Sequence, residues 1–267
     1  MNKTMRGAVG LLLCLGGTPL VSANDSTAAL GAGGLVFTKT DAIAMEQEDL
    51  FISEDKIRVA YVFRNTTKQD INTRVAFPVP AFPEEPDMDI GLDVKSSNPM
   101  GFSVRVEGKK KAFDTEIKKN DGTVNMTHHW MQTFPAGKSL KVVHEYQPAI
   151  GGEAMLWFQD EERTAKISKY CIEPDFEKWL DKTNQPDKGM VLSPRYVDYI
   201  LTTWANWKGA IGKFRLTVQK AKAEDKISFC GTGVKKVDAR TFVLEKTNFT
   251  PEEDLAVMFV HQYKLEN

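Results

Sequence analysis

The stretch Lys56-Ile57-Arg58-Val59-Ala60-Tyr61-Val62-Phe63-Arg64 decides the fold. Large apolar side chains recur at every second position, and two of its arginines fall on the opposite face. A period of two is typical of a β-strand with one buried face. The polar residues 65–70 follow, and the same alternation resumes over residues 71–77. The sequence therefore predicts two strands joined by a short turn as an antiparallel hairpin.

The same alternation predicts more strands, and helix signals are scarce. Apolar residues spaced i, i+3 and i+4 predict one short helix over residues 174–180. Many short strands with few helices indicate a mainly β, antiparallel β-sandwich-like fold. The chain is large for one simple sandwich, so we expect two packed β lobes, residues 24–160 and 161–267. The further strands are expected at residues 102–107, 128–134, 139–146, 154–158, 196–203, 213–219, 226–230, 241–246 and 255–263.

The charge balance excludes one class of partner. The chain has 35 lysines and arginines and 36 aspartates and glutamates, which gives a formal net charge of -1. Binding to nucleic acid requires a clustered basic excess that neutralises phosphates. We therefore expect no nucleic acid as the main partner.

Residues 1–23 have the three-part pattern of a secretory signal. Lys3 and Arg6 give a positive start, residues 8–15 form a short apolar run, and Val21-Ser22-Ala23 provides a cleavage site. The apolar run is too short to span a bilayer, and the alternative is a buried N-terminal helix. No later stretch is long and apolar enough for a transmembrane segment. The pattern predicts a cleaved signal peptide and a periplasmic mature protein.

Export changes the meaning of the cysteines. Cleavage after Ala23 removes Cys14 and leaves Cys171 and Cys230. An even number of cysteines in an oxidising compartment favours a disulfide between them. The alternative, a catalytic Cys/His pair, would need a thiol that escapes pairing.

The sequence carries few signals of catalysis. His128 and His129 are adjacent, so on a strand they point to opposite faces, and His144 lies on an apolar strand face typical of a core histidine. The histidines lack the local spacing of a metal site, and the nucleotide-binding motifs are incomplete, so we expect no cofactor and no metal. The alternative is an envelope hydrolase or metal-dependent enzyme that uses His144 and nearby acids.

Tryptophans give the most suggestive binding signal. Trp204, Asn206 and Trp207 lie in the stretch 204–209 between two predicted strands, with Trp130 as a candidate neighbour. Flat apolar rings beside polar groups suit a carbohydrate face or a protein hot spot. The alternative is a buried aromatic plug that closes one end of the core.

Four stretches carry a resemblance to a known family. On these stretches the chain resembles an uncharacterised family of exported bacterial proteins, a domain of unknown function. The resemblance implies export and a single family domain, and it supplies no activity, substrate or catalytic residue. The stretches are Asn24-Asp25-Ser26, Phe134-Pro135-Ala136-Gly137-Lys138, His144-Glu145-Tyr146-Gln147-Pro148 and Asn206-Trp207-Lys208-Gly209-Ala210-Ile211-Gly212.

The absence of catalytic motifs in the sequence, together with the sandwich class, favours a non-catalytic binding or assembly module of the cell envelope. The expected partner is an envelope protein or a glycan.

We predict that signal peptidase cleaves the chain after Ala23. Mass spectrometry of the protein from a periplasmic extract should show an N-terminus at Asn24. Recovery of intact Met1 in a cytosolic fraction would contradict this prediction.

Overall fold

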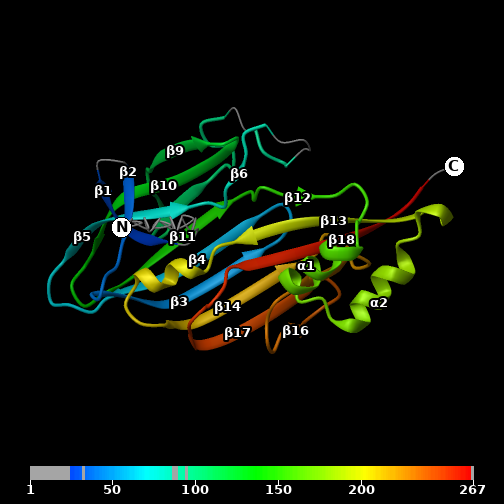
Figure 1. The fold of residues 1–267 in the computed structure, drawn as a ribbon. Coiled ribbons are helices and arrows are strands. Elements are labelled where there is room, and N and C mark those ends of the chain that lie inside the picture. The colour runs from blue at the N-terminus through cyan, green and yellow to red at the C-terminus, as the bar shows by residue number, and fades with distance from the viewer. Residues whose placement is uncertain (1–24, 32–33, 86–89, 94–95, 266–267) are drawn as a thin grey trace, which may run out of the picture.

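A computed structural model describes residues 25–31, 34–85, 90–93 and 96–265. The expected signal peptide therefore lies outside the described residues. In the described part of the chain the strands form three sheets, which we name A, B and C, and most neighbouring strands are antiparallel (Figure 1). The predicted mainly β, sandwich-like fold is confirmed.

Sheet A has the order β2-β1-β5-β10-β6, and β9 also pairs with β10. Sheet B has the order β16-β17-β14-β3-β4-β11-β7-β8, and sheet C has the order β12-β13-β18-β15. The bounds in sheet A are β1 Ser26–Gly31, β2 Gly34–Thr38, β5 Ile71–Pro78, β6 Phe82–Pro83, β9 Asp114–Asn120 and β10 Thr123–Phe134. Those in sheet B are β3 Ile43–Ile52, β4 Ile57–Asn65, β7 Ser103–Val106, β8 Lys109–Lys110, β11 Ser139–Tyr146, β14 Ile211–Gln219, β16 Lys235–Lys236 and β17 Thr241–Phe249. Those in sheet C are β12 Gly151–Gly152, β13 Met190–Tyr199, β15 Lys226–Phe229 and β18 Leu255–Lys264.

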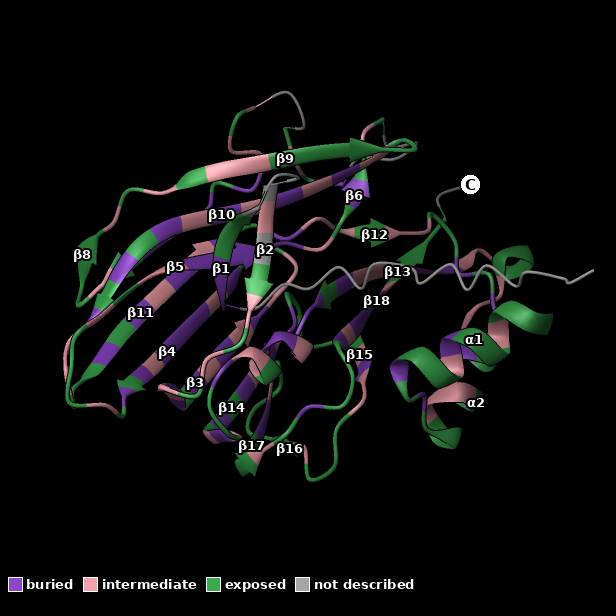
Figure 2. Cartoon of the chain, turned by 60° about the vertical axis from the view of Figure 1, so that its left-hand side comes forward, coloured by how far each residue is buried: buried purple, intermediate pink, exposed green. Residues whose placement is uncertain are grey.

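The alternation in the sequence places the core. On β4 the side chains of Ile57, Val59, Tyr61 and Phe63 are fully buried. Phe63 packs edge-on against Phe134 of sheet A, and the Tyr61 hydroxyl lies 3.0 Å from the Tyr199 hydroxyl of sheet C. Sheets A and C therefore both cover the inner face of sheet B. Figure 2 shows the resulting bands of buried and exposed residues along β10 and β11.

The predicted hairpin between residues 56–64 and 71–77 is wrong. Both strands form, but β4 pairs with β3 and β11 in sheet B, whereas β5 pairs with β1 and β10 in sheet A. The chain crosses from one sheet to the other between them. Two strands that are joined in a hairpin and two strands that lie in different sheets show the same alternation of apolar and polar residues. The pattern alone therefore does not distinguish a hairpin from a crossing.

A buried asparagine shapes this crossing. Asn65 ends β4 and is fully buried. Its amide nitrogen donates to the carbonyls of Gln69 at 2.7 Å and Phe134 at 2.8 Å, and its side-chain oxygen accepts the N–H of Thr67 at 2.9 Å. These bonds hold residues 65–70 in a wide loop that spans the two sheets.

A second crossing lies against the first. The connection from β10 to β11 also runs from sheet A to sheet B. The N–H of Asn65 donates to the carbonyl of Lys138 at 3.1 Å, and the N–H of Ala136 donates to the Asp70 carboxylate at 2.8 Å. The two crossings therefore close the same end of the sandwich.

Sheet B includes strands from both sides of residue 160. β14 lies parallel to β3, with Lys213 opposite Gln47 and Val218 opposite Ile52. One cluster of buried side chains extends from Ile43 to Phe259 in the sequence. Sheet B therefore joins the two expected lobes, residues 24–160 and 161–267, into one layer.

Two α-helices cover the outer face of sheet C in the described part of the chain (Figure 1). The predicted short helix is confirmed as α2, Pro174–Thr183, and α1, Asp160–Tyr170, precedes it. The short 3-10 helices η1, Pro186–Lys188, and η2, Thr202–Asn206, flank β13. A second core lies between the helices and sheet C and contains Leu156, Phe158, Tyr170, Ile172, Leu180, Leu192, Met258 and Val260.

Three local differences from the sequence-based expectation have physical reasons. α1 is rich in charge and has few apolar side chains, so its helical period is weak, and the acidic residues 159–163 look like a loop. Residues 154–158 form no strand, although the N–H of Leu156 donates to the Leu192 carbonyl. The alternation does not predict β3, because polar residues interrupt it and a bulge between Met45 and Gln47 shifts the register.

We predict that Asn65→Ala lowers the free energy of unfolding by about 2–4 kcal/mol, since it leaves buried backbone groups without partners. Urea unfolding followed by far-UV circular dichroism measures the change. Asn72→Ala is the matched control, because Asn72 lies nearby on β5 but is exposed, and a loss within about 0.5 kcal/mol is expected. Equal effects of the two variants would contradict the proposed role of Asn65.

Candidate functional site

The predicted binding stretch 204–209 turns toward the interior. Trp207 is 4% exposed, and its ring nitrogen donates to the carbonyl of Asp25 at 2.6 Å. Asn206 donates its side-chain amide to the Ser26 hydroxyl at 2.9 Å. Trp204 is partly buried and donates to the carbonyl of Pro251 at 2.7 Å. The stretch therefore holds the start of β1 against the core.

A buried carboxylate and imidazole meet at the same place. Asp25 and His144 are both fully buried, and Oδ2 of Asp25 lies 3.0 Å from Nε2 of His144. Burial raises the pKa of the Asp25 carboxyl, and the neighbouring His144 opposes that rise. The rings of Phe77 and Phe102 stack on His144 with centroids at 4.9 and 5.2 Å. Three stretches of the family resemblance, those that contain Asp25, His144 and Trp207, thus converge in the core.

This placement bears on the hydrolase alternative. His144 has no solvent exposure, so a substrate has no access to its ring in this conformation. Within the described ranges, no group of three or more histidine, cysteine, aspartate or glutamate side chains is arranged to hold a metal ion. His144 belongs to the packing between the sheets A and B.

Trp130 also faces the interior. Its side chain is 3% exposed on β10, and its ring centroid lies 5.4 Å from that of His144. Trp130 and Trp207 therefore occupy the positions that the alternative of a core plug requires. Binding of a ligand by Trp130, Trp204, Asn206 or Trp207 stays a prediction, and the exposed tryptophan of this structure is Trp157, which is 56% exposed.

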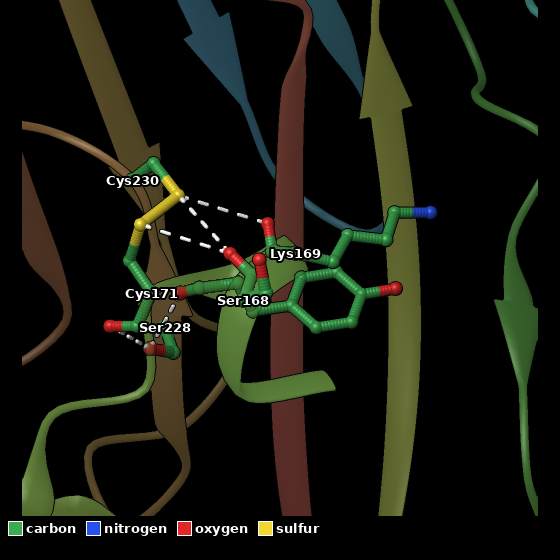
Figure 3. Close-up of a disulfide and its surroundings, with 6 residues drawn as sticks. Ser168, Lys169, Cys171, Ser228 and Cys230 are labelled. Carbon is green, nitrogen blue, oxygen red and sulfur yellow. Dashed lines mark hydrogen bonds between the residues drawn. A yellow bond between two sulfur atoms is a disulfide. The ribbon is translucent and has the colours of Figure 1, made fainter. Parts of the chain in front are cut away.

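A disulfide positions α1. The predicted bond between Cys171 and Cys230 is confirmed (Figure 3). Cys171 is the left-handed C-cap of α1, and Cys230 directly follows β15. The Ser228 hydroxyl of β15 donates to the carbonyl of Tyr170 at 2.9 Å. The last turn of α1 is thereby fixed covalently and by a hydrogen bond to the edge strand of sheet C.

An arginine joins α1 to α2. The guanidinium of Arg163 lies 2.6 Å from Glu177 and 2.8 Å from Asp181, and it also covers the ring of Phe158 at 4.5 Å. Hydrogen bonds from Arg163 lower the pKa of Asp181. The two helices are therefore fixed to each other and present a defined surface.

A groove of about 400 Å³ opens between α1 and β13. Tyr170 and Tyr196 line it with parallel rings whose centroids are 5.2 Å apart. The Tyr196 hydroxyl donates to Oε1 of Glu153 at 2.5 Å. The ammonium of Lys166 lies 3.0 Å from Glu153 and 2.6 Å from Glu162. Stacked rings, two ammonium groups and three carboxylates thus line one groove, with Lys169, Glu161 and Glu162 on its exposed side.

The protonation states in the groove follow from these contacts. Burial lowers the pKa of Lys166, but hydrogen bonds to Glu162 and Glu153 outweigh it, and the net shift is upward. Burial, followed by the hydrogen bond to Glu153, raises the pKa of Tyr196. Burial also raises the pKa of Tyr170. At neutral pH Lys166 is therefore a cation, and the phenols of Tyr170 and Tyr196 are neutral.

The alternation of apolar and polar residues along the sequence does not reveal the groove between α1 and β13. Glu153 lies in a loop, and Lys166 and Tyr170 lie on α1, whose residues resemble an acidic loop in the sequence. The spacing of Glu162, Lys166 and Tyr170, each four residues after the last, is the available signal, because it places the three on one helix face.

The histidine His261 is held between two carboxylates. Its Nε2 lies 2.7 Å from Glu54 in the turn between β3 and β4, and its Nδ1 lies 3.1 Å from Asp225 before β15. The hydrogen bond to Glu54 raises the pKa of His261, burial opposes this rise, and Asp225 adds to it. The protonated ring can donate to both carboxylates at once and so links sheet C to sheet B.

Comparison with known proteins places the chain in a family. The model of a family described as "Domain of unknown function (DUF4424)" matches residues 23–120 and 117–258. No curated protein matches the chain. In the described part of the chain, no helix has the length and apolar character needed to cross a membrane.

One of the matching solved structures shares the fold at low sequence identity. A Legionella pneumophila protein proposed to bind nutrients matches with a TM-score of 0.54 and 16% identity, over 89% of this chain and 70% of that chain. Yeast LTA4 hydrolase matches with a TM-score of 0.38 and 9% identity, over 82% of this chain and 29% of that chain. An M1 zinc metallopeptidase from Deinococcus radiodurans matches with a TM-score of 0.29 and 9% identity, over 84% of this chain and 43% of that chain. The chain thus spans less than half of either enzyme, and at these scores the likeness says nothing about activity.

We predict that His261 makes stability fall with rising pH. Its folded-state pKa lies above the value of 6.5 for an unperturbed histidine, so the stabilisation is complete below pH 6.5 and is lost as the pH rises through the folded-state pKa. Urea unfolding at a series of pH values should show this loss in the wild type and a flatter profile in His261→Gln.

The matched control is His129→Gln. His129 is partly exposed, and its pKa is lowered, first by burial and then by Arg74. This variant should keep the loss of stability on the alkaline side. A wild-type profile that stays flat above pH 6.5 would contradict the role of His261.

Proposed function

Since the chain belongs to the DUF4424 family of domains of unknown function, we propose from its geometry that it is a non-catalytic binding module for a small hydroxyl-bearing solute such as a sugar. The observation that carries the proposal is the groove between α1 and β13, where Tyr170 and Tyr196 lie beside Lys166, Glu153 and Glu162. Aromatic side chains contact the apolar faces of sugar rings, and carboxylates accept hydrogen bonds from hydroxyl groups.

The protonation states favour binding over catalysis. A general base must be able to take a proton near the working pH. Lys166 is held as a cation by Glu162 and Glu153, and the raised pKa of Tyr196 keeps its phenol neutral. Lys166 and Tyr196 can therefore orient a ligand through hydrogen bonds, but neither is poised as a base or nucleophile.

The construction of the groove also supports recognition. The disulfide between Cys171 and Cys230 and the ion pairs of Arg163 fix α1 before any ligand arrives. A site that is ordered in advance loses less conformational entropy on binding. The fold shared with the Legionella pneumophila protein proposed to bind nutrients fits this class of function, although it indicates the fold alone.

The cellular setting of the proposal comes from the sequence. The signal pattern of residues 1–23 favours export, and a disulfide is typical of an oxidising compartment. We place the module in the periplasm, where an envelope glycan or its fragments would supply the ligand.

The test is isothermal titration calorimetry, which measures the affinity of the full mature protein for a panel of monosaccharides and short glycans. A sugar that binds wild type should bind Glu162→Gln about tenfold more weakly, because the variant replaces a charged acceptor by a neutral one. Glu173→Gln is the matched control, since Glu173 is also exposed and makes the same charge change just before α2, outside the groove. Its affinity should equal that of wild type.

Two results would contradict the proposal. One is a wild-type protein that binds no member of the panel. The other is an equal loss in Glu162→Gln and Glu173→Gln, which would indicate an effect of net charge and not of the groove.

A further inference from the structure

Five basic side chains gather at one edge of sheet B, and we name them the basic edge: Arg105, Lys109, Lys110, Lys111 and Lys141. They come from the hairpin of β7 and β8, the residue that follows it, and the neighbouring β11. Arg105 lies directly opposite Lys110. The N–H of Glu107 at the hairpin tip donates to the carbonyl of Lys141 at 2.9 Å, which brings Lys141 beside the tip.

The basic edge is electrostatically unbalanced. Four of its side chains are exposed and Lys111 is half-buried, and none of the five has a salt bridge with any part of the chain that the structure describes. On β9, the next strand along the chain but a member of sheet A, Lys118 by contrast pairs with Glu116. Two carboxylates flank the hairpin: Glu107, which already accepts the N–H of Lys141, and Asp114, which lines the adjoining groove. Arg105 and Lys110 lie opposite each other, and like charges in such a pair repel one another unless an anion lies between them.

A groove with both polar and apolar lining adjoins the basic edge. It has a volume of about 250 Å³ and is lined by Lys111, Ala112, Phe113, Asp114, Trp130 and Met131. Met131 is 44% exposed, whereas Trp130 forms the buried base of the groove at 3% exposure. The ring nitrogen of Trp130 is buried and has no hydrogen-bond partner among the described residues. Lys111 belongs both to the basic edge and to the groove, so the two form one continuous surface.

We propose that this surface docks on an anionic lipid bilayer. The basic edge contacts headgroup phosphates, and the groove at Met131 and Phe113 receives apolar parts of the interface. Cations beside exposed apolar side chains are the combination that binds the surface of anionic membranes without crossing them. The formal net charge of the whole chain is -1, so the attraction must come from this local patch and not from the protein as a whole. The docking surface is separate in its residues from the groove at α1.

The experiment is co-sedimentation of the mature protein with vesicles. One set contains phosphatidylcholine alone, and the other contains phosphatidylcholine mixed with phosphatidylglycerol. The wild-type protein should sediment with the mixed vesicles and stay in the supernatant with the phosphatidylcholine vesicles. The double variant Lys109→Gln/Lys110→Gln should bind the mixed vesicles roughly thirtyfold more weakly, since each lysine near an anionic surface contributes a factor of about five.

The chain provides a matched control. Lys235 and Lys236 form the similarly short and exposed strand β16 in the same sheet, at its opposite edge. Lys235→Gln/Lys236→Gln changes the net charge by the same amount and should bind the mixed vesicles as wild type does. Met131→Asn removes exposed apolar surface without changing charge, and it should weaken binding several-fold while the unfolding midpoint in urea stays the same.

Three outcomes would overturn the proposal. Equal binding to neutral and anionic vesicles would remove the role of the cations. Equal losses in the two lysine pairs would assign the effect to net charge. Complete competition by millimolar inorganic phosphate would indicate a site for a soluble phosphate and not for a lipid surface.

Discussion

The hydrogen bond between Asp25 and His144 ties the start of the described chain to the centre of the sandwich. Burying a carboxyl or an imidazole away from water costs free energy. Each is tolerated in the core because the other is its hydrogen-bond partner. Trp207 fixes the backbone of Asp25 from the opposite half of the chain, and the rings of Phe77 and Phe102 enclose His144. Sheets A and B and the η2 turn therefore share one polar centre. Loss of either partner would leave a buried polar group in aromatic surroundings, so two residues far apart in the sequence depend on each other.

The sequence is informative about strands and poor about their partners. The alternation from Ile57 to Phe63 places β4 and identifies its buried face, because the period of a strand is a local property. The pairing of β4 and β5 with different sheets depends on Asn65, whose contacts reach Phe134, and such contacts are not visible in a local pattern. The sequence pattern does not predict β3, because the polar residue Glu48 occupies a buried position in this strand. Glu48 accepts a hydrogen bond from Tyr199 there, and a local pattern cannot show such a distant partner.

The candidate site likewise has parts that the sequence predicts and parts that it does not. The disulfide is predictable from the cysteine count and the expected export, which are both properties of the whole chain. The aromatic content of the stretch 204–209 attracts attention, yet Trp207 lies in the core, since large aromatic side chains serve interiors and surfaces equally well. The groove of Tyr170 and Tyr196 depends on α1. The Cys171–Cys230 bond and Arg163 hold this helix in place, whereas its own residues predict it poorly.

The parallel pair of β3 and β14 has a consequence for how the molecule is made. Gln47 and Lys213 are neighbours in sheet B although more than half of the chain separates them. Non-local pairings of this kind close large loops and slow folding. Because the chain is synthesised from the N-terminus, β3 is exposed with an open edge long before β14 is made and can cover it. Open strand edges tend to pair with other chains. Glu46, Glu48 and Asp49 place negative charges along β3, and charged side chains on an open edge discourage wrong partners during this interval. The polar residues that hide β3 from sequence analysis thus also protect the nascent chain.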